Sequence, residues 1–95
     1  MIVAELTITP LTDEDLTPFI DAAVDVIKNS GLKYEVDAMG TTIEGEIDQI
    51  FDVVRNAHEA VKRLGAERVM TEIRIDDRAS GVTIEEEVDS YRASV

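Results

Sequence analysis

Alternating carboxylates and apolar side chains, in the two longest strand-like segments, are the residues of this sequence that could do chemistry. Segments 2–9 and 68–76 both alternate, and successive residues of a strand point to opposite faces of a sheet. One face then carries Ala4, Leu6, Ile8, Val69, Ile73 and Ile75, and the other carries Glu5, Thr7, Glu72, Arg74 and Asp76. We expect the second face either to meet water or to bind something cationic.

The overall charge narrows the class of partner. Twenty-one acidic residues against nine lysines and arginines give a formal net charge of −12. Such a field repels nucleic acid phosphates and anionic lipids, so neither nucleic acid nor a membrane surface is expected as a partner. The acidity is explained either by solubility in a high-salt cell or by attraction for cationic ligands, and the two explanations are compatible.

Chain length and residue usage exclude several further classes of protein and of chemical site. Ninety-five residues suit one domain, which at this size buries roughly 60 to 68% of its unfolded surface and often gains from partners. The absence of cysteine excludes disulfides, thiolate metal sites and a thiol nucleophile. No apolar run approaches the ~20 residues of a membrane span, and Glu5 comes too early for a signal peptide. A cytoplasmic location is expected.

Between these two strands, the spacing of apolar residues changes from the period of a helix to that of a strand and back again. After Pro10, Thr12 and Asp15 have capping-box spacing, which predicts a turn or a first helical turn; Thr17-Pro18 is a second helix start. The first helix is expected to end around Asn29–Gly31, because its apolar residues recur at helical spacing up to that point: Phe19, Ile20, Ala23, Val24 and Ile27. Segments 34–39 and 41–45 alternate around Gly40 and predict a hairpin.

A second amphipathic helix is predicted from Ile47 to Leu64, followed by the last long strand. The order of the elements is thus strand, helix, strand, strand, helix, strand. This order predicts an α+β, ferredoxin-like βαββαβ sandwich, with a four-stranded antiparallel sheet and two helices on one face. We assign residues 1–77 to this domain. Residues 78–95 are expected to form a loop and a short helix, begun by capping-box spacing at Thr83 and Glu86, which packs on the same domain or on a neighbouring subunit.

Four groups of residues, in the same order along nearly the whole chain, resemble the small thiamine-binding family related to YkoF. They are Ala4–Leu11, Gly31–Glu35 with Met39–Gly45, Ala57–Val61 with Gly65–Val69, and Ile73–Arg78. The resemblance implies a ferredoxin-like fold, a homotetramer built as a dimer of dimers, and binding of thiamine or its hydroxymethylpyrimidine part without catalysis. It implies no cofactor. The chain departs from the pattern in its acidity and in the stretch Asp13–Asp15.

The polar sheet face supplies the candidate ligand site. We expect it to gather Glu5, Thr7, Glu35, Asp37, Met39, Thr42, Glu44, Glu46, Glu72, Arg74 and Asp76, which makes seven carboxylates and one arginine. Crowded carboxylates repel one another, and a cation lowers that cost.

The roles follow from the residue types. Glu5 and Glu44, with Asp37 on the same face, would supply charge to a thiazolium, and Thr7 and Thr42 would hydrogen-bond the aminopyrimidine. Met39 would form an apolar wall, and Arg74 would position a carboxylate or a phosphate. The alternative is a solvated face, or cross-strand ion pairs in a subunit interface.

A second location for the ligand is open at this point. Thr41, His58 and Thr71 are polar residues on the otherwise apolar, helix-covered face, so they either hydrogen-bond one another or line a pocket between the second helix and the sheet. In that pocket Thr41 and His58 would contact the ligand. A lone histidine without a second ligand does not predict a metal site. Asp76-Asp77-Arg78 is interpreted as a turn or an interface salt bridge.

Three functions are compatible with these residues. The first is a non-catalytic, oligomeric binding protein for thiamine or its hydroxymethylpyrimidine part. The second is a ligand-sensing regulatory module of ferredoxin-like type, and the third is a divalent-cation-dependent enzyme that uses the acidic face. No phosphate loop, nucleophile elbow or catalytic triad pattern is present in the sequence.

Overall fold

The computed structural model describes residues 1–92. Its elements follow the expected order: β1 (Ile2–Pro10), α1 (Thr17–Asn29), β2 (Lys33–Asp37), β3 (Gly40–Gly45), α2 (Ile47–Lys62), β4 (Val69–Asp76) and α3 (Ile84–Arg92). The four strands form one antiparallel sheet in the order β2-β3-β1-β4. The predicted ferredoxin-like α+β fold is confirmed.

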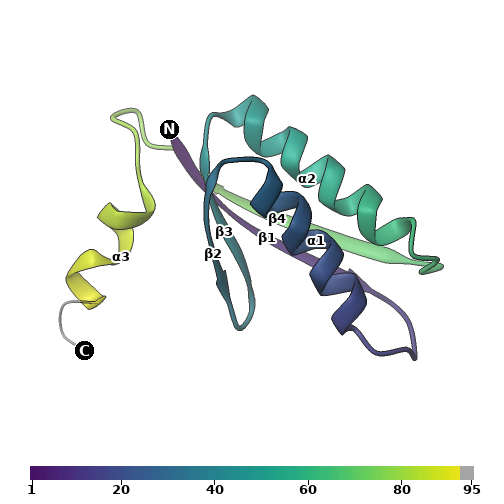
Figure 1. The fold of residues 1–95 in the computed structure, drawn as a ribbon. Coiled ribbons are helices and arrows are strands. Elements are labelled where there is room, and N and C mark those ends of the chain that lie inside the picture. The colour runs from purple at the N-terminus through teal and green to yellow at the C-terminus, as the bar shows by residue number, and fades with distance from the viewer. Residues whose placement is uncertain (93–95) are drawn as a thin grey trace.

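The register of β1 fixes the two faces of the sheet. Leu6 lies opposite Thr41 of β3 and Ile73 of β4, whereas its neighbour Glu5 lies opposite Thr42 and Arg74. Figure 1 shows α1 and α2 side by side on one face of the sheet and α3 on the other side. We call the face turned away from α1 and α2 the open face.

The hydrophobic core lies between α1, α2 and the helix-covered face of the sheet. Ile43 of β3 and Ile50 of α2 are fully buried in it. Ala57, further along the same face of α2, is equally buried. The other buried members of this cluster are Ile2, Ala4, Leu6, Ile27 and Val53. The core therefore uses the even-numbered residues of β1 and leaves the odd-numbered ones on the open face.

Helix α1 begins at the second of its two predicted starts. The Thr12 hydroxyl accepts a hydrogen bond from the Glu14 amide at 3.1 Å, and an Asp15 oxygen accepts one from the Thr17 amide at 3.0 Å. These bonds form turns in the loop, and the second lowers the pKa of Asp15 below its usual value. At the other end, Gly31 takes a φ of 79°, which favours glycine directly after the helix.

Helix α3 follows a loop that crosses to the open face. The Thr83 hydroxyl accepts a hydrogen bond from the Glu86 amide at 3.2 Å, as its capping-box spacing predicts. Val82 and Ile84 are both almost completely buried, so the first turn of α3 is anchored on its own domain. The final part of the predicted segment 78–95 lies beyond residue 92, outside the described residues. None of the helices within residues 1–92 has the length and apolarity needed to span a membrane.

We expect Ile50→Ala to destabilise the protein by about 2 to 5 kcal/mol, because the substitution leaves a cavity in the core. Ile20→Ala is the matched control, since the Ile20 side chain on α1 is 51% exposed; its cost should stay below about 1 kcal/mol. Urea unfolding followed by circular dichroism measures both. Equal losses in the two variants would contradict the placement of the core.

Candidate functional site

A cavity of about 280 Å³ lies between the open face of the sheet and α3. The sheet contributes polar side chains from all four strands, and α3 closes one side. The lining residues are Val3, Glu5, Glu35, Asp37, Thr42, Arg74, Ile75, Asp76, Ile84, Glu87 and Val88. We call this hollow the acidic cavity, because five of these residues are carboxylates and one is an arginine.

The strand register explains how the polar residues come together. Glu5 occupies the central strand, with Thr42 beside it on β3 and Arg74 beside it on β4. Glu35 lies beyond Thr42 on β2. Arg74 is therefore the cross-strand neighbour of Glu5, and its positive charge reduces the repulsion within the row. The remaining carboxylates leave the cavity strongly negative, which favours a cationic occupant.

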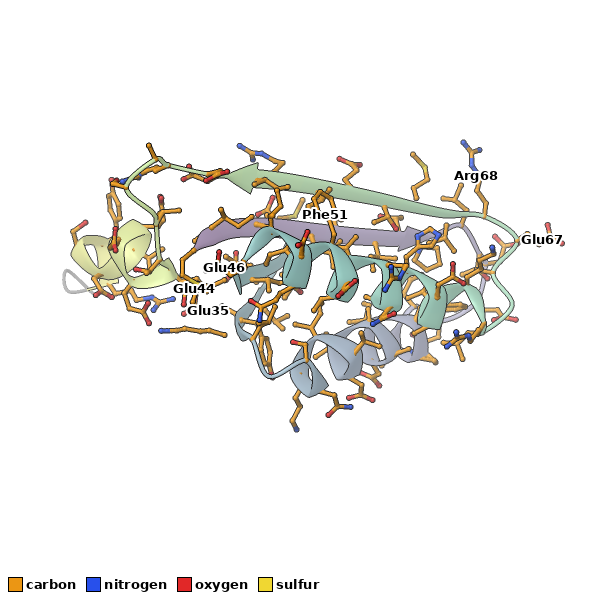
Figure 2. All side chains as sticks on the ribbon, turned by 90° about the horizontal axis from the view of Figure 1, so that it is seen from above. Glu35, Glu44, Glu46, Phe51, Glu67 and Arg68 are labelled. Carbon is orange, nitrogen blue, oxygen red and sulfur yellow. The ribbon has the colours of Figure 1, made fainter. Side chains whose placement is uncertain are left out.

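Charged contacts hold α3 against this face. A Glu44 carboxylate oxygen accepts a hydrogen bond from the Ile84 amide at 2.8 Å, which satisfies a free N–H at the start of the helix. Lys33 forms an ion pair with Glu85 in the first turn, and Arg92 in the last turn donates a hydrogen bond to Glu35. That bond raises the pKa of Arg92 above its usual value. Figure 2 shows Glu35 and Glu44 at the end of the sheet near α3.

The structure divides the eight predicted site residues among three places. Glu5, Asp37, Thr42 and Arg74 line the acidic cavity. Glu44 does not line it and instead caps α3. Thr7, Met39 and Thr41 line a different hollow, beside α1, which Asp37 also borders.

Two residues assigned to the polar strand face lie outside the strands. Strand β2 ends at Asp37, so Met39 falls in the hairpin turn, where it is 83% exposed. Glu46 is the N-cap of α2, and its amide donates a hydrogen bond to the Gln49 side chain at 3.0 Å. The assignment of both to the sheet face is wrong, because the alternation was continued past the ends of the strands.

The second hollow, of about 200 Å³, lies between α1 and the tip of the β2–β3 hairpin. Its walls are mostly apolar, with Phe19, Ile20 and Val36 among them. The Thr7 hydroxyl donates a hydrogen bond to the Met39 carbonyl at 3.3 Å and so ties the tip to β1. Thr41, which is only 8% exposed, also lines this hollow. We call this hollow the hairpin groove.

The alternative pocket beneath the second helix does not bring its expected residues together. Nδ1 of His58 on α2 is hydrogen-bonded to the Thr71 hydroxyl on β4, with 2.6 Å between the two atoms. Thr41 instead lines the hairpin groove beside α1. His58 is thus a packed side chain with a partner. Among residues 1–92, no three His, Asp or Glu side chains lie close enough to hold one metal ion.

Helix α3 supplies three site residues that sequence reasoning missed, and the strands supply two more, Val3 and Ile75. Ile84, Glu87 and Val88 form one wall of the acidic cavity. Their spacing of three and four residues places them on one side of the helix. Nothing local in the sequence says that this side of the helix meets the open face rather than the helix-covered one.

Comparison with known proteins identifies the family. Residues 4–92 match the family described as thiamine-binding protein. The chain belongs to this family. Its relatives include a UPF0045 protein of Methanothermobacter thermautotrophicus, 43% identical with 82% of each chain covered, and the UPF0045 protein YqgV of Bacillus subtilis, 39% identical with 95% of this chain and 93% of the relative covered.

Two solved structures of the same fold support the architecture. A domain of unknown function from Bacillus cereus superposes with a TM-score of 0.91 at 42% identity, covering 98% of this chain and 91% of the other. A candidate thiamine biosynthesis or salvage protein from Thermotoga maritima gives a TM-score of 0.88 at 34% identity, covering 96% and 98%. This member of the thiamine-binding protein family thus keeps the fold over nearly its full length.

We expect Glu44→Ala to loosen the first turn of α3, because the Ile84 amide loses its acceptor. The cost should be about 0.5 to 2 kcal/mol, as for other helix caps. Hydrogen exchange at the Ile84 amide measures it directly. Glu72→Ala is the control, since Glu72 is an exposed carboxylate on the same sheet face and takes no part in capping α3. Unchanged exchange at Ile84 in the Glu44 variant would contradict the capping role.

Proposed function

We propose that this protein binds thiamine or its hydroxymethylpyrimidine part in the acidic cavity, without catalysing a reaction. The observation that carries the proposal is the composition of the cavity wall, where five carboxylates and one arginine surround a space of about 280 Å³. Thiamine carries a permanently charged thiazolium ring, and a carboxylate-lined space is the arrangement that stabilises such a cation. Membership of the thiamine-binding protein family supports the same ligand class.

The cavity offers the other contacts that such a ligand needs. The Thr42 hydroxyl lies beside Glu5, and a hydroxyl both donates and accepts hydrogen bonds to an aminopyrimidine. Val3, Ile84 and Val88 provide apolar surface for a flat ring. The volume of about 280 Å³ is just below the ~300 to 1,000 Å³ of typical ligand pockets, which suits one small heterocycle rather than a large cofactor.

The test is isothermal titration calorimetry with thiamine and, separately, with hydroxymethylpyrimidine. Glu5→Gln should weaken thiamine binding by roughly 1 to 3 kcal/mol, because it removes a charge from the cavity while keeping its shape. Glu67→Gln makes the same change in net charge at the far end of the molecule from Glu35 and Glu44, as Figure 2 shows, and should bind like the parent protein. Equal affinity of the two variants would overturn the placement in the acidic cavity, and absence of binding by the parent protein would overturn the function.

The proposal includes assembly as a homotetramer built from two dimers. Strand β4 is an edge strand of the sheet, and exposed edges favour pairing with another chain. Ile47 and Phe51 of α2 and Ile75 of β4 are large apolar side chains that remain 38 to 48% exposed. Figure 2 shows Phe51 on the side of α2 toward β4. An apolar strip beside an unpaired strand supports an interface there.

We expect Phe51→Glu to lower the oligomeric state measured by sedimentation velocity, since a carboxylate in an apolar contact is costly to desolvate. Ile20→Glu is the control, because Ile20 is equally exposed but lies on α1, which the structure places over the other half of the sheet. A parent protein that sediments as a monomer would refute the tetramer. Dissociation by the Ile20 variant alone would move the interface to α1.

A further inference from the structure

Two carboxylates of the acidic cavity already have cationic partners within this chain. Glu35 accepts a hydrogen bond from Arg92, the last residue of α3. Glu87 accepts one from Arg78, in the loop before α3, at 2.9 Å. Both carboxylates line the cavity, whereas neither arginine does. The chain therefore places its own guanidinium groups at the rim of the site that is proposed to take a cation.

The two ends of α3 are held in different ways. At its start, Val82 and Ile84 are each only 1% exposed, and the Ile84 amide is bonded to Glu44. At its end, Arg92 forms an ion pair with Glu35, and the two side chains are 51% and 30% exposed. Exposed ion pairs contribute about 0 to 1 kcal/mol. The Arg92–Glu35 pair can therefore open at little cost while the first turn stays anchored.

A cation that enters the cavity meets Arg92 as a competitor. The Glu35 carboxylate already shares its charge with the guanidinium, and a second positive charge beside it is repelled by Arg92. Arg74 is different in this respect, because the pairing of β4 with β1 fixes its backbone directly opposite Glu5. Arg92 is the last residue of α3 and its side chain is 51% exposed, so moving the guanidinium away from Glu35 costs about as much as one exposed ion pair.

We propose that Arg92 is a built-in competitor for the cationic ligand, so that ligand binding displaces it from Glu35. This inference rests on the proposed function, since it concerns the regulation of the same cavity. It makes the contact between Arg92 and Glu35 depend on whether the cavity is occupied by a cation. An uncharged ligand, such as hydroxymethylpyrimidine, gains much less from displacing the arginine.

The test compares Arg92→Gln with Arg55→Gln in thiamine titrations at one ionic strength. Both variants lose one positive charge and one exposed ion pair, but Arg55 pairs with Asp52 within α2, away from the cavity. We expect Arg92→Gln to bind thiamine about two- to five-fold more tightly than Arg55→Gln, the range that corresponds to an exposed ion pair. Thiamine binding to the Arg92 variant alone supports the inference as well, because the competitor then dominates in the parent chain.

Hydrogen exchange of the parent protein gives a second readout that a merely structural role of Arg92 would not produce. Saturating thiamine should speed exchange of the amides in the last turn of α3 and leave the Ile84 amide protected. Equal or weaker thiamine binding by Arg92→Gln, or slower exchange in that turn, overturns the competition and leaves the proposed function intact. Absence of thiamine binding to the parent protein and to Arg92→Gln overturns both.

Discussion

The pairing of β1 on both of its edges is the constraint on which the rest of this structure depends. Glu5 and Leu6 are neighbours in sequence, and because β1 lies between β3 and β4, each is fixed by two partners at once. A shift of one residue would place Glu5 and its neighbours under α1 and α2 and expose the apolar residues. Burial of Leu6 therefore determines that the carboxylates gather on the open face.

A flat acidic face does not by itself enclose a ligand. Two layers, helices on a sheet, leave the open face to solvent, and a carboxylate row there is simply hydrated. The loop after β4 carries α3 across to this face, and the burial of Val82 and Ile84 fixes it there. The acidic cavity exists because a third layer covers part of the sheet, so the short C-terminal helix, rather than the sheet alone, makes the site concave.

Period and local signals were sufficient to predict the elements and the two faces of the sheet. In β1 and β4 one face is more buried than the other, so apolar and polar residues alternate along each strand. This alternation can be recognised within the segment itself, without knowledge of the rest of the fold. The same alternation misplaced Met39 and Glu46, since hydrophobic period does not mark the residue at which a strand stops. The cavity was harder to predict. Glu44 and Ile84 are forty residues apart along the chain, and no spacing rule relates a strand carboxylate to a helix that docks on it from such a distance.

The contacts along α3 connect stability with function through their different physical origins. Apolar burial at the start of the helix does not depend on the charge state of the cavity, whereas the Arg92 pair at its end draws on a carboxylate that lines the cavity. Because the net charge is −12, few cationic side chains are present that could form such a pair. Placement of one of its few arginines beside this cavity lowers the repulsion among the carboxylates when no ligand is bound. Arg92 thus stabilises the empty cavity and, in our proposal, competes with the cationic ligand. One exposed ion pair therefore affects both stability and ligand binding.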